Sequence, residues 1–171
     1  SYAEKTTNNT NFALLVSEKF TEPFKEPIQY GQHIARLANM LAGGILVQRF
    51  GDLLDGRRST PERIKSSIIK PTLTCATPGD LSLVIPYRQM TSIIEMLQAL
   101  DKVCPGTASR YTLLYGIEVK FYSARVKLTN NLETEGVKNL FAIGDGAGVT
   151  RGLIQASASG VHAARTICER G

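Results

Sequence analysis

The sequence predicts an α+β fold, in which a mixed-sheet domain is followed by one strand and one helix of a Rossmann-like domain. Two observations predict it. Helical and strand patterns mix over about the first 120 residues without the strict alternation of a parallel α/β sheet. Residues 139–165 differ from this, because an apolar run leads into a glycine-rich turn and then into a helix of small residues. We therefore expect one domain over residues 1–122 and a second piece over residues 123–171.

Composition supports a globular chain with enough apolar residues for a core. The 171 residues are 43% hydrophobic and 20% charged, typical of one or two folded domains. Neither a membrane-spanning run nor the apolar core of a signal peptide is present, so we expect no membrane association. Cys75, Cys104 and Cys168 are odd in number and lack metal-ligand spacing, which favours unpaired thiols and a cytoplasmic location.

The first half of the chain predicts helices with clear end signals. Apolar spacing indicates a helix over residues 32–42, ended by Gly43-Gly44. Ser59 and Glu62 have capping-box spacing, so a short helix should start there and end before Pro71. Further expected elements are strands at 12–16 and 45–50, a turn at 51–58, strands at 72–76 and 81–85, and a turn at 77–80 between them.

Pro86 opens the clearest amphipathic helix, which should end by Cys104-Pro105-Gly106. Its apolar stripe is Met90, Ile93, Ile94, Leu97 and Leu100. After it we expect a long strand at 111–122, a segment at 125–128 paired around Glu133, a strand at 140–143 and a helix to about Cys168.

The glycine turn between the last strand and the last helix carries the chemical signal. Gly144, Gly146 and Gly148 allow positive φ and remove side chains that would block a ligand. The following helix offers free N–H groups and a positive dipole end. Asp145 only accepts hydrogen bonds when ionised, so it suits the hydroxyls of a ribose or ribityl chain better than a phosphate.

Two other interpretations apply to this stretch. The GxGxxxG pattern of Gly146, Gly148 and Gly152 is a weak variant of a dinucleotide fingerprint, and the 19 residues after Gly152 leave no room for a second strand. Tight packing alone would explain the small-residue stripe Gly152, Ala156, Gly160 and Ala164, but it does not explain three glycines and an acid before it.

These residues resemble a known family. The segment from Gly144 to Arg165, GDGAGVTRGLIQASASGVHAAR, is similar to the C-terminal flavin-binding segment of FAD-dependent dehydrogenases with the two-dinucleotide-binding fold. The resemblance extends through most of the chain, including FALLVSEKFTEPF, YGQHIARLANMLAGG, QRFGDLLDGRRST, ATPGDLSLVIPYR and TLLYGIEVKFYS.

The resemblance implies a cofactor, FAD, and places its contacts. Asp145 would contact the ribityl hydroxyls, and the start of the last helix would approach the flavin. The implied cofactor-binding residues are Gly144, Asp145, Gly146, Arg151, Gly152, Leu153 and Ile154. Residues 1–122 would form the cap or substrate-side domain.

The chain departs from this family at its start. No GxGxxG strand-turn-helix is present near the N-terminus, and that element holds the ADP half of FAD in the family. We therefore expect the chain to be the C-terminal part of a longer flavoprotein, whose N-terminal FAD-binding part is its partner. As a fragment it should be inactive and should bind FAD weakly or not at all.

The alternative is a non-catalytic binding or interaction module with a basic surface. Net charge is +5, and basic residues are dense from Arg49 to Lys70, although without the interleaved aromatics of a single-strand nucleic-acid platform. Nucleic-acid binding is therefore not expected. Further candidates were Arg57-Arg58 for an anionic substrate and the strand face of Glu118, Lys120 and Tyr122, whereas His33 and His162 are interpreted as structural. No catalytic residue, hydrolytic triad, phosphate loop or metal cluster is predicted.

Overall fold

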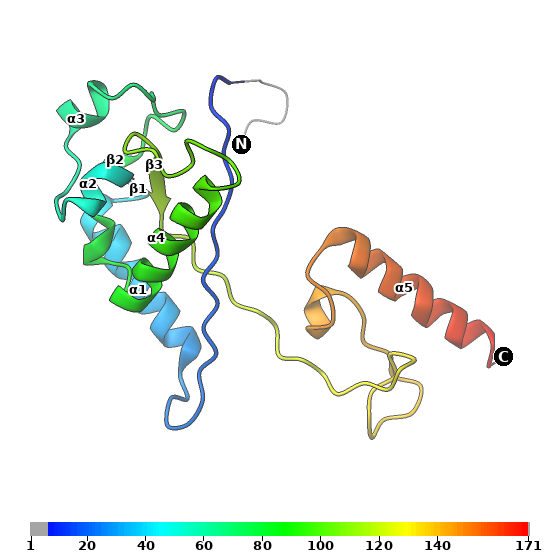
Figure 1. The fold of residues 1–171 in the computed structure, drawn as a ribbon. Coiled ribbons are helices and arrows are strands. Elements are labelled where there is room, and N and C mark those ends of the chain that lie inside the picture. The colour runs from blue at the N-terminus through cyan, green and yellow to red at the C-terminus, as the bar shows by residue number, and fades with distance from the viewer. Residues whose placement is uncertain (1–6, 171) are drawn as a thin grey trace. The chain divides into compact units, whose positions relative to one another are not determined.

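A computed structural model of the chain describes residues 7–170 and divides it into two compact units, with the boundary between Val119 and Lys120 (Figure 1). Each unit is described by itself. The predicted α+β class is confirmed, because five α-helices accompany one small mixed sheet in the described residues. None of the helices described is long and apolar enough to cross a membrane.

The first unit is a three-stranded sheet with helices around it. Strand β1 (Leu46–Arg49) lies in the middle, parallel to β2 (Thr77–Pro78) and antiparallel to β3 (Leu113–Gly116). The register pairs Val47 with Pro78 on one side and with Tyr115 on the other. The helical elements are α1 (Pro27–Ala42), α2 (Phe50–Leu54), α3 (Pro61–Lys65), the 3₁₀ turn η1 (Leu81–Leu83) and α4 (Tyr87–Asp101).

Apolar side chains from both long helices and from β1 form one core. Ala38 comes from α1, Leu46 from β1, and Met90 and Leu97 from α4. Ile93 and Ile94 pack against this core while remaining partly exposed, so the predicted stripe of α4 is the face that packs inward. Burial of such side chains is the main stabilising contribution to this unit.

Helix α1 begins five residues earlier than predicted. Pro27 stands in its first turn, where the missing N–H costs nothing and the fixed φ suits a helix. Its predicted end is confirmed, since Gly43 adopts a left-handed φ of 64° and its N–H bonds to Asn39 O at 2.7 Å. The hydroxyl of Thr77 then donates to Ala42 O at 2.9 Å, which links the end of α1 to β2.

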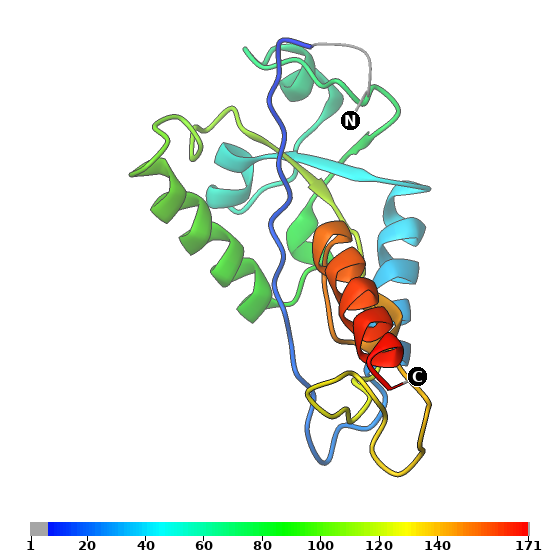
Figure 2. The same cartoon turned by 90° about the vertical axis from the view of Figure 1, so that its right-hand side faces the viewer.

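Several predicted strands are wrong because strand pairing depends on residues far away in sequence. Residues 12–16 are extended but unpaired, as Figure 2 shows for the segment before α1. Residues 72–76 form no strand, and the parallel strand is instead the predicted turn, at Thr77 and Pro78. Residues 81–85 contain η1, whose N-cap Asp80 accepts from Ser82 N–H at 2.9 Å. Strand β3 ends at Gly116, so the proposed strand face of Glu118, Lys120 and Tyr122 does not exist.

The structure also differs from the predicted turn at 51–58 and from the predicted start of the helix after it. Residues 50–54 form α2, and Thr60 rather than Ser59 caps α3, accepting from Arg63 N–H at 3.4 Å. Helix α3 ends at Lys65, which agrees with the predicted end before Pro71.

The second unit contains a bridged loop, the 3₁₀ turn η2 (Asp145–Ala147) and helix α5 (Leu153–Cys168). The expected pairing around Glu133 is present as isolated bridges, Leu128 with Thr134 and Glu133 with Phe141. The predicted strand at 140–143 is reduced to that single bridge, because no neighbouring strand extends the ladder in the described residues. The helix to Cys168 is confirmed (Figure 2).

Candidate functional site

Gly144 and Gly148 have the positive φ that the sequence allows at this turn, whereas Gly146 does not. Gly144 has φ 71° and ψ −167°, and Gly148 has φ 68°, both in a region that favours glycine. Gly148 N–H closes the turn on Asp145 O at 3.0 Å. Gly144 N–H donates to the buried hydroxyl of Ser159 at 3.0 Å, and that hydroxyl donates to Ala156 O at 2.7 Å. Ser159 therefore attaches the turn to α5.

The glycines of the turn fall into two kinds. A Cβ on Gly148 would lie 2.9 Å from Arg125 Cα and 3.1 Å from Ala124 O, so this glycine is required by a close approach of two backbones. A Cβ on Gly146 or Gly152 would meet nothing within 4 Å among the described atoms. Gly146 and Gly152 thus leave open space on the turn, and packing within the unit does not explain them.

Asp145 is exposed, and one of its two carboxylate oxygens accepts a hydrogen bond. Its Oδ1 accepts a hydrogen bond of 2.5 Å from the hydroxyl of Thr150. Its other oxygen has no hydrogen-bond donor in the described part of the chain. A carboxylate can accept several hydrogen bonds, so Asp145 is oriented by Thr150 and retains acceptor capacity for hydroxyl groups.

The first turn of α5 presents backbone donors. No described side chain caps it, and the first N–H groups of a helix have no partner inside the helix. The N–H of Arg151, just before the helix, donates to Gln155 Oε1 at 3.3 Å. Leu153 and Ile154 stand at this end with exposed fractions of 88% and 86%. Open donors thus lie beside unusually exposed apolar side chains.

Arg151 stacks its guanidinium on an aromatic ring. Its Cζ lies 3.9 Å from the centroid of the Tyr122 ring, a close cation–π contact. Tyr122 precedes Arg151 by 29 residues, so the contact depends on the fold of the second unit. The sequence pattern predicts instead that Tyr122 shares a strand face with Glu118 and Lys120.

A groove of about 500 Å³ adjoins the turn. Arg125, Lys127 and Val149 are among its lining residues, with Glu135 as the acidic one. Val126 N–H donates to Ala147 O at 3.2 Å, so the strip of chain at this groove is attached directly to the turn.

The first unit holds a buried polar network that sequence reasoning missed. Asp52 is fully buried and accepts from the Ser59 hydroxyl at 2.8 Å and from Arg57 Nε at 3.0 Å. Arg49 Nε lies 3.3 Å from Asp52 Oδ2, an ion-pair distance without hydrogen-bond geometry. The sequence signal for this network is the spacing of Asp52, Arg57 and Ser59, in a segment whose residues predict a turn and a helix cap.

This network alters the interpretation of the basic stretch. Arg57 also lies 3.1 Å from Asp55, and Arg110 donates to Asp55 at 2.5 Å. That hydrogen bond, with the positive charges nearby, lowers the pKa of Asp55 against a smaller opposing effect of desolvation. Arg57 is therefore committed to internal ion pairs, which weakens the hypothesis that Arg57 and Arg58 together bind an anion.

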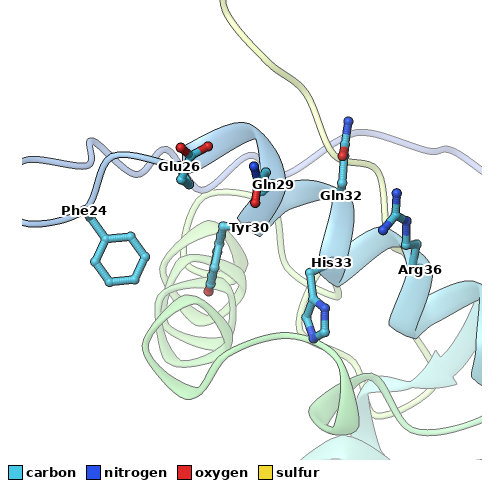
Figure 3. Close-up of a pocket in the computed structure, with 7 residues that line it drawn as sticks. All are labelled: Phe24, Glu26, Gln29, Tyr30, Gln32, His33 and Arg36. Carbon is cyan, nitrogen blue, oxygen red and sulfur yellow. The ribbon is translucent and has the colours of Figure 1, made fainter.

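A second concavity, of about 590 Å³, lies along the start of α1 (Figure 3). Its polar side chains do not converge, because Tyr30 and His33 project to one side of the helix and Gln32 and Arg36 to the other. The rings of Phe20, Phe24 and Tyr30 contact one another at its edge. Desolvation, reinforced by Glu18, raises the pKa of Tyr30. We assign no site there.

The remaining candidates are structural. His162 Nε2 lies 3.1 Å from Asn130 O, which ties α5 to the bridged loop. Groups of His, Cys, Asp and Glu that could hold a metal are absent from the described residues, and Cys75, Cys104 and Cys168 are unpaired and exposed.

A family model and a relative match this chain. The model of a family described as glucose inhibited division protein A matches residues 72–170, which include the whole turn and the whole of α5. A protein of Clostridium beijerinckii, described as an uncharacterized protein, is 32% identical over 99% of this chain. The chain spans about a third of that relative, 33% of its length.

Proposed function

We propose that this chain, which belongs to the glucose-inhibited division protein A family, supplies the ribityl and flavin end of the FAD site of a longer dehydrogenase. The family is one of FAD-binding oxidoreductases. FAD, when bound, supplies the redox centre of such an enzyme. The activity belongs to the longer protein, and the residues below are what this chain contributes.

The open side of the glycine turn is the observation that carries the proposal. Gly144 and Gly148 are explained by turn geometry, whereas Gly146 and Gly152 leave space that no described atom fills. A cofactor edge that approaches the backbone needs such space. Asp145, oriented by Thr150, accepts hydrogen bonds from the ribityl hydroxyls.

The start of α5 supports the flavin end of the site. The N–H groups at Gly152, Leu153 and Ile154 are at the positive end of a 16-residue helix. Donors in this position favour the negative charge that a flavin ring gains on reduction. While Arg151 N–H is bonded to Gln155, these later N–H groups are the ones available for the cofactor.

The partner is the N-terminal part of the same longer protein, which would hold the ADP half of FAD. Leu153 and Ile154 have exposed fractions of 88% and 86%, and Val161 and Ile167 are also exposed on α5. Contact with the rest of an FAD-binding domain would cover Val161 and Ile167, and Leu153 and Ile154 would stand at the edge of the flavin site. The first unit then serves as the substrate-side domain.

A comparison of FAD binding by two proteins tests this function. The 171-residue chain is titrated with FAD beside the longer protein that contains the upstream region. We expect the longer protein to bind FAD with a flavin spectral change and the chain alone to bind weakly or not at all. Micromolar FAD binding by the chain alone would overturn the proposal that it holds only one end of the FAD site. A longer protein that binds no FAD would overturn the proposed function.

A matched pair of glycine variants locates the cofactor in the longer protein. Gly146→Ala places a methyl group in the open space on the turn and should weaken FAD binding at unchanged stability. Gly44→Ala is the control, because its Cβ also meets nothing within 4 Å but lies in the first unit after α1. Equal FAD affinity for both variants would contradict the proposed site.

A further inference from the structure

The stack of Arg151 on Tyr122 leaves the guanidinium with unused donors. Its Cζ lies 3.9 Å from the ring centroid, so Tyr122 meets the guanidinium and holds it in place. In the described residues no carboxylate pairs with this guanidinium and no carbonyl accepts from it. Asp145, the acid of the adjacent turn, accepts instead from Thr150 at 2.5 Å. The N–H groups of the guanidinium are therefore available to an outside ligand.

The chemistry of this arrangement selects an organic carboxylate. A guanidinium is planar and presents parallel N–H groups that match the two oxygens of a carboxylate. Leu153 and Ile154 follow Arg151 in the chain with exposed fractions of 88% and 86%, and Tyr122 is 53% exposed. A ligand with one carboxylate and an apolar or aromatic body would use both the charge and this apolar surface.

We propose that Arg151 binds the carboxylate of an organic acid with an apolar body, and that Tyr122 is the positioning residue that holds its guanidinium. Such an acid is the substrate class of the oxidoreductase; this last step rests on the proposed function. Binding itself needs only residues of the second unit, so it can be measured without FAD.

Nuclear magnetic resonance on the 171-residue chain tests the site. Benzoate is the probe, benzamide is its uncharged counterpart of the same shape, and inorganic phosphate tests for general anion binding. We expect benzoate to shift the Arg151 Nε–H resonance and the amides of Leu153 and Ile154 in a saturable way. Benzamide should not. Equal shifts with benzamide, no saturation with benzoate, or tighter binding of phosphate at the same resonances would overturn the carboxylate site.

Variants separate the roles of the two residues. Arg151→Lys keeps the charge but loses the planar fork, and should weaken benzoate binding by about tenfold. Arg165→Lys makes the same change in the last turn of α5 and should have no effect. Tyr122→Phe keeps the ring and should bind as the unchanged chain does, whereas Tyr122→Leu should bind several-fold more weakly. Unchanged binding in Tyr122→Leu would overturn the positioning role.

Failure here is distinguishable from failure of the proposed function. A chain that does not bind benzoate, from a longer protein that binds FAD, would remove the carboxylate site and leave the flavin proposal intact. Benzoate binding by the chain, with no FAD binding by the longer protein, would support the carboxylate site and overturn the flavin proposal. Amide spectra of each variant check that the second unit remains folded. We expect it to remain folded because Arg151 and Tyr122 are both exposed.

Discussion

The hydroxyl of Ser59 donates a 2.8 Å hydrogen bond to the carboxylate of Asp52, and the two side chains are 1% and 0% exposed. The same hydroxyl accepts from Arg49 N–H at 2.9 Å. One serine thus connects β1 to the start of α2, and the ion pairs of Arg57 complete the arrangement. Because a buried carboxylate that loses a partner is costly, this contact leads to the first prediction.

Ser59→Ala should destabilise the first unit by about 1–3 kcal/mol, since Asp52 would lose a donor in a place that water does not reach. Urea unfolding followed by circular dichroism measures the change. Ser66→Ala is the control, because the Ser66 hydroxyl donates to Arg63 O at an exposed site, and it should change stability by less than about 0.5 kcal/mol. Similar losses of unfolding free energy in both variants would show that the hydrogen bond to Asp52 stabilises the unit no more than an exposed one does.

Gly148→Ala should destabilise the second unit by at least about 1 kcal/mol, because an L residue resists positive φ. The new Cβ would also lie 2.9 Å from Arg125 Cα, which adds to the loss. Faster amide hydrogen exchange in α5 reports the effect. Gly146→Ala, whose Cβ meets nothing within 4 Å, should leave exchange nearly unchanged. The prediction fails if the two variants exchange alike.

Arg110→Gln should raise the pKa of Asp55 toward its ordinary value of about 3.9, because the Arg110 hydrogen bond is the largest cause of its lowering. A carboxyl with a lowered folded pKa adds stability above its unfolded pKa and loses it as pH falls through the folded pKa. The difference in unfolding free energy between the unchanged chain and Arg110→Gln should therefore shrink as pH falls from the unfolded pKa of Asp55 through its folded pKa. Carboxyl-carbon resonances follow the titration directly.

Glu133 provides the internal control for that titration. Its pKa is lowered mainly by a hydrogen bond from Arg170 in the second unit, and then by Asn139 N–H. Arg110→Gln should leave the Glu133 titration unchanged. A shift of both carboxyl groups would indicate a general change in the fold instead of a local one.

Thr150→Val should weaken FAD binding by the longer protein, because Asp145 would lose the donor that orients it. We expect a few-fold loss of affinity, on the order of one neutral hydrogen bond, and a larger loss for Asp145→Ala. Fluorescence titration with FAD compares the variants. If Asp145→Ala binds FAD as tightly as the unchanged protein, the ribityl role of Asp145 is wrong.

Local signals in the sequence were sufficient for α4, α5 and the end of α1, but not for α2, whose residues the sequence predicts as a turn. Gly43 predicted the end of α1, Pro86 predicted the start of α4, and the small-residue run predicted α5. These are properties of neighbouring residues, since helical hydrogen bonds and caps act within a few positions. The same holds for the glycine turn, where Gly144 and Gly148 adopt the predicted backbone.

Strands and side-chain contacts were not determined in this way. Thr77 and Pro78 form a strand because β1 lies beside them, although their own residues favour a turn. Arg57 is occupied because Asp52 and Asp55 lie within 3.1 Å of it. The cap of α3 moved to Thr60 because the Ser59 hydroxyl is already bonded to Asp52.

The sequence by itself therefore determined α4, α5, the end of α1 and the glycine turn, because each depends on consecutive residues. The flavin role of Asp145 stays a prediction. Only the tertiary structure decided that Tyr122 holds Arg151, at 3.9 Å and across 29 residues of chain. It also decided which glycines are open, since a Cβ on Gly148 meets Arg125 whereas one on Gly146 meets nothing. Contacts of this kind depend on distances in space, which spacing along the chain does not set.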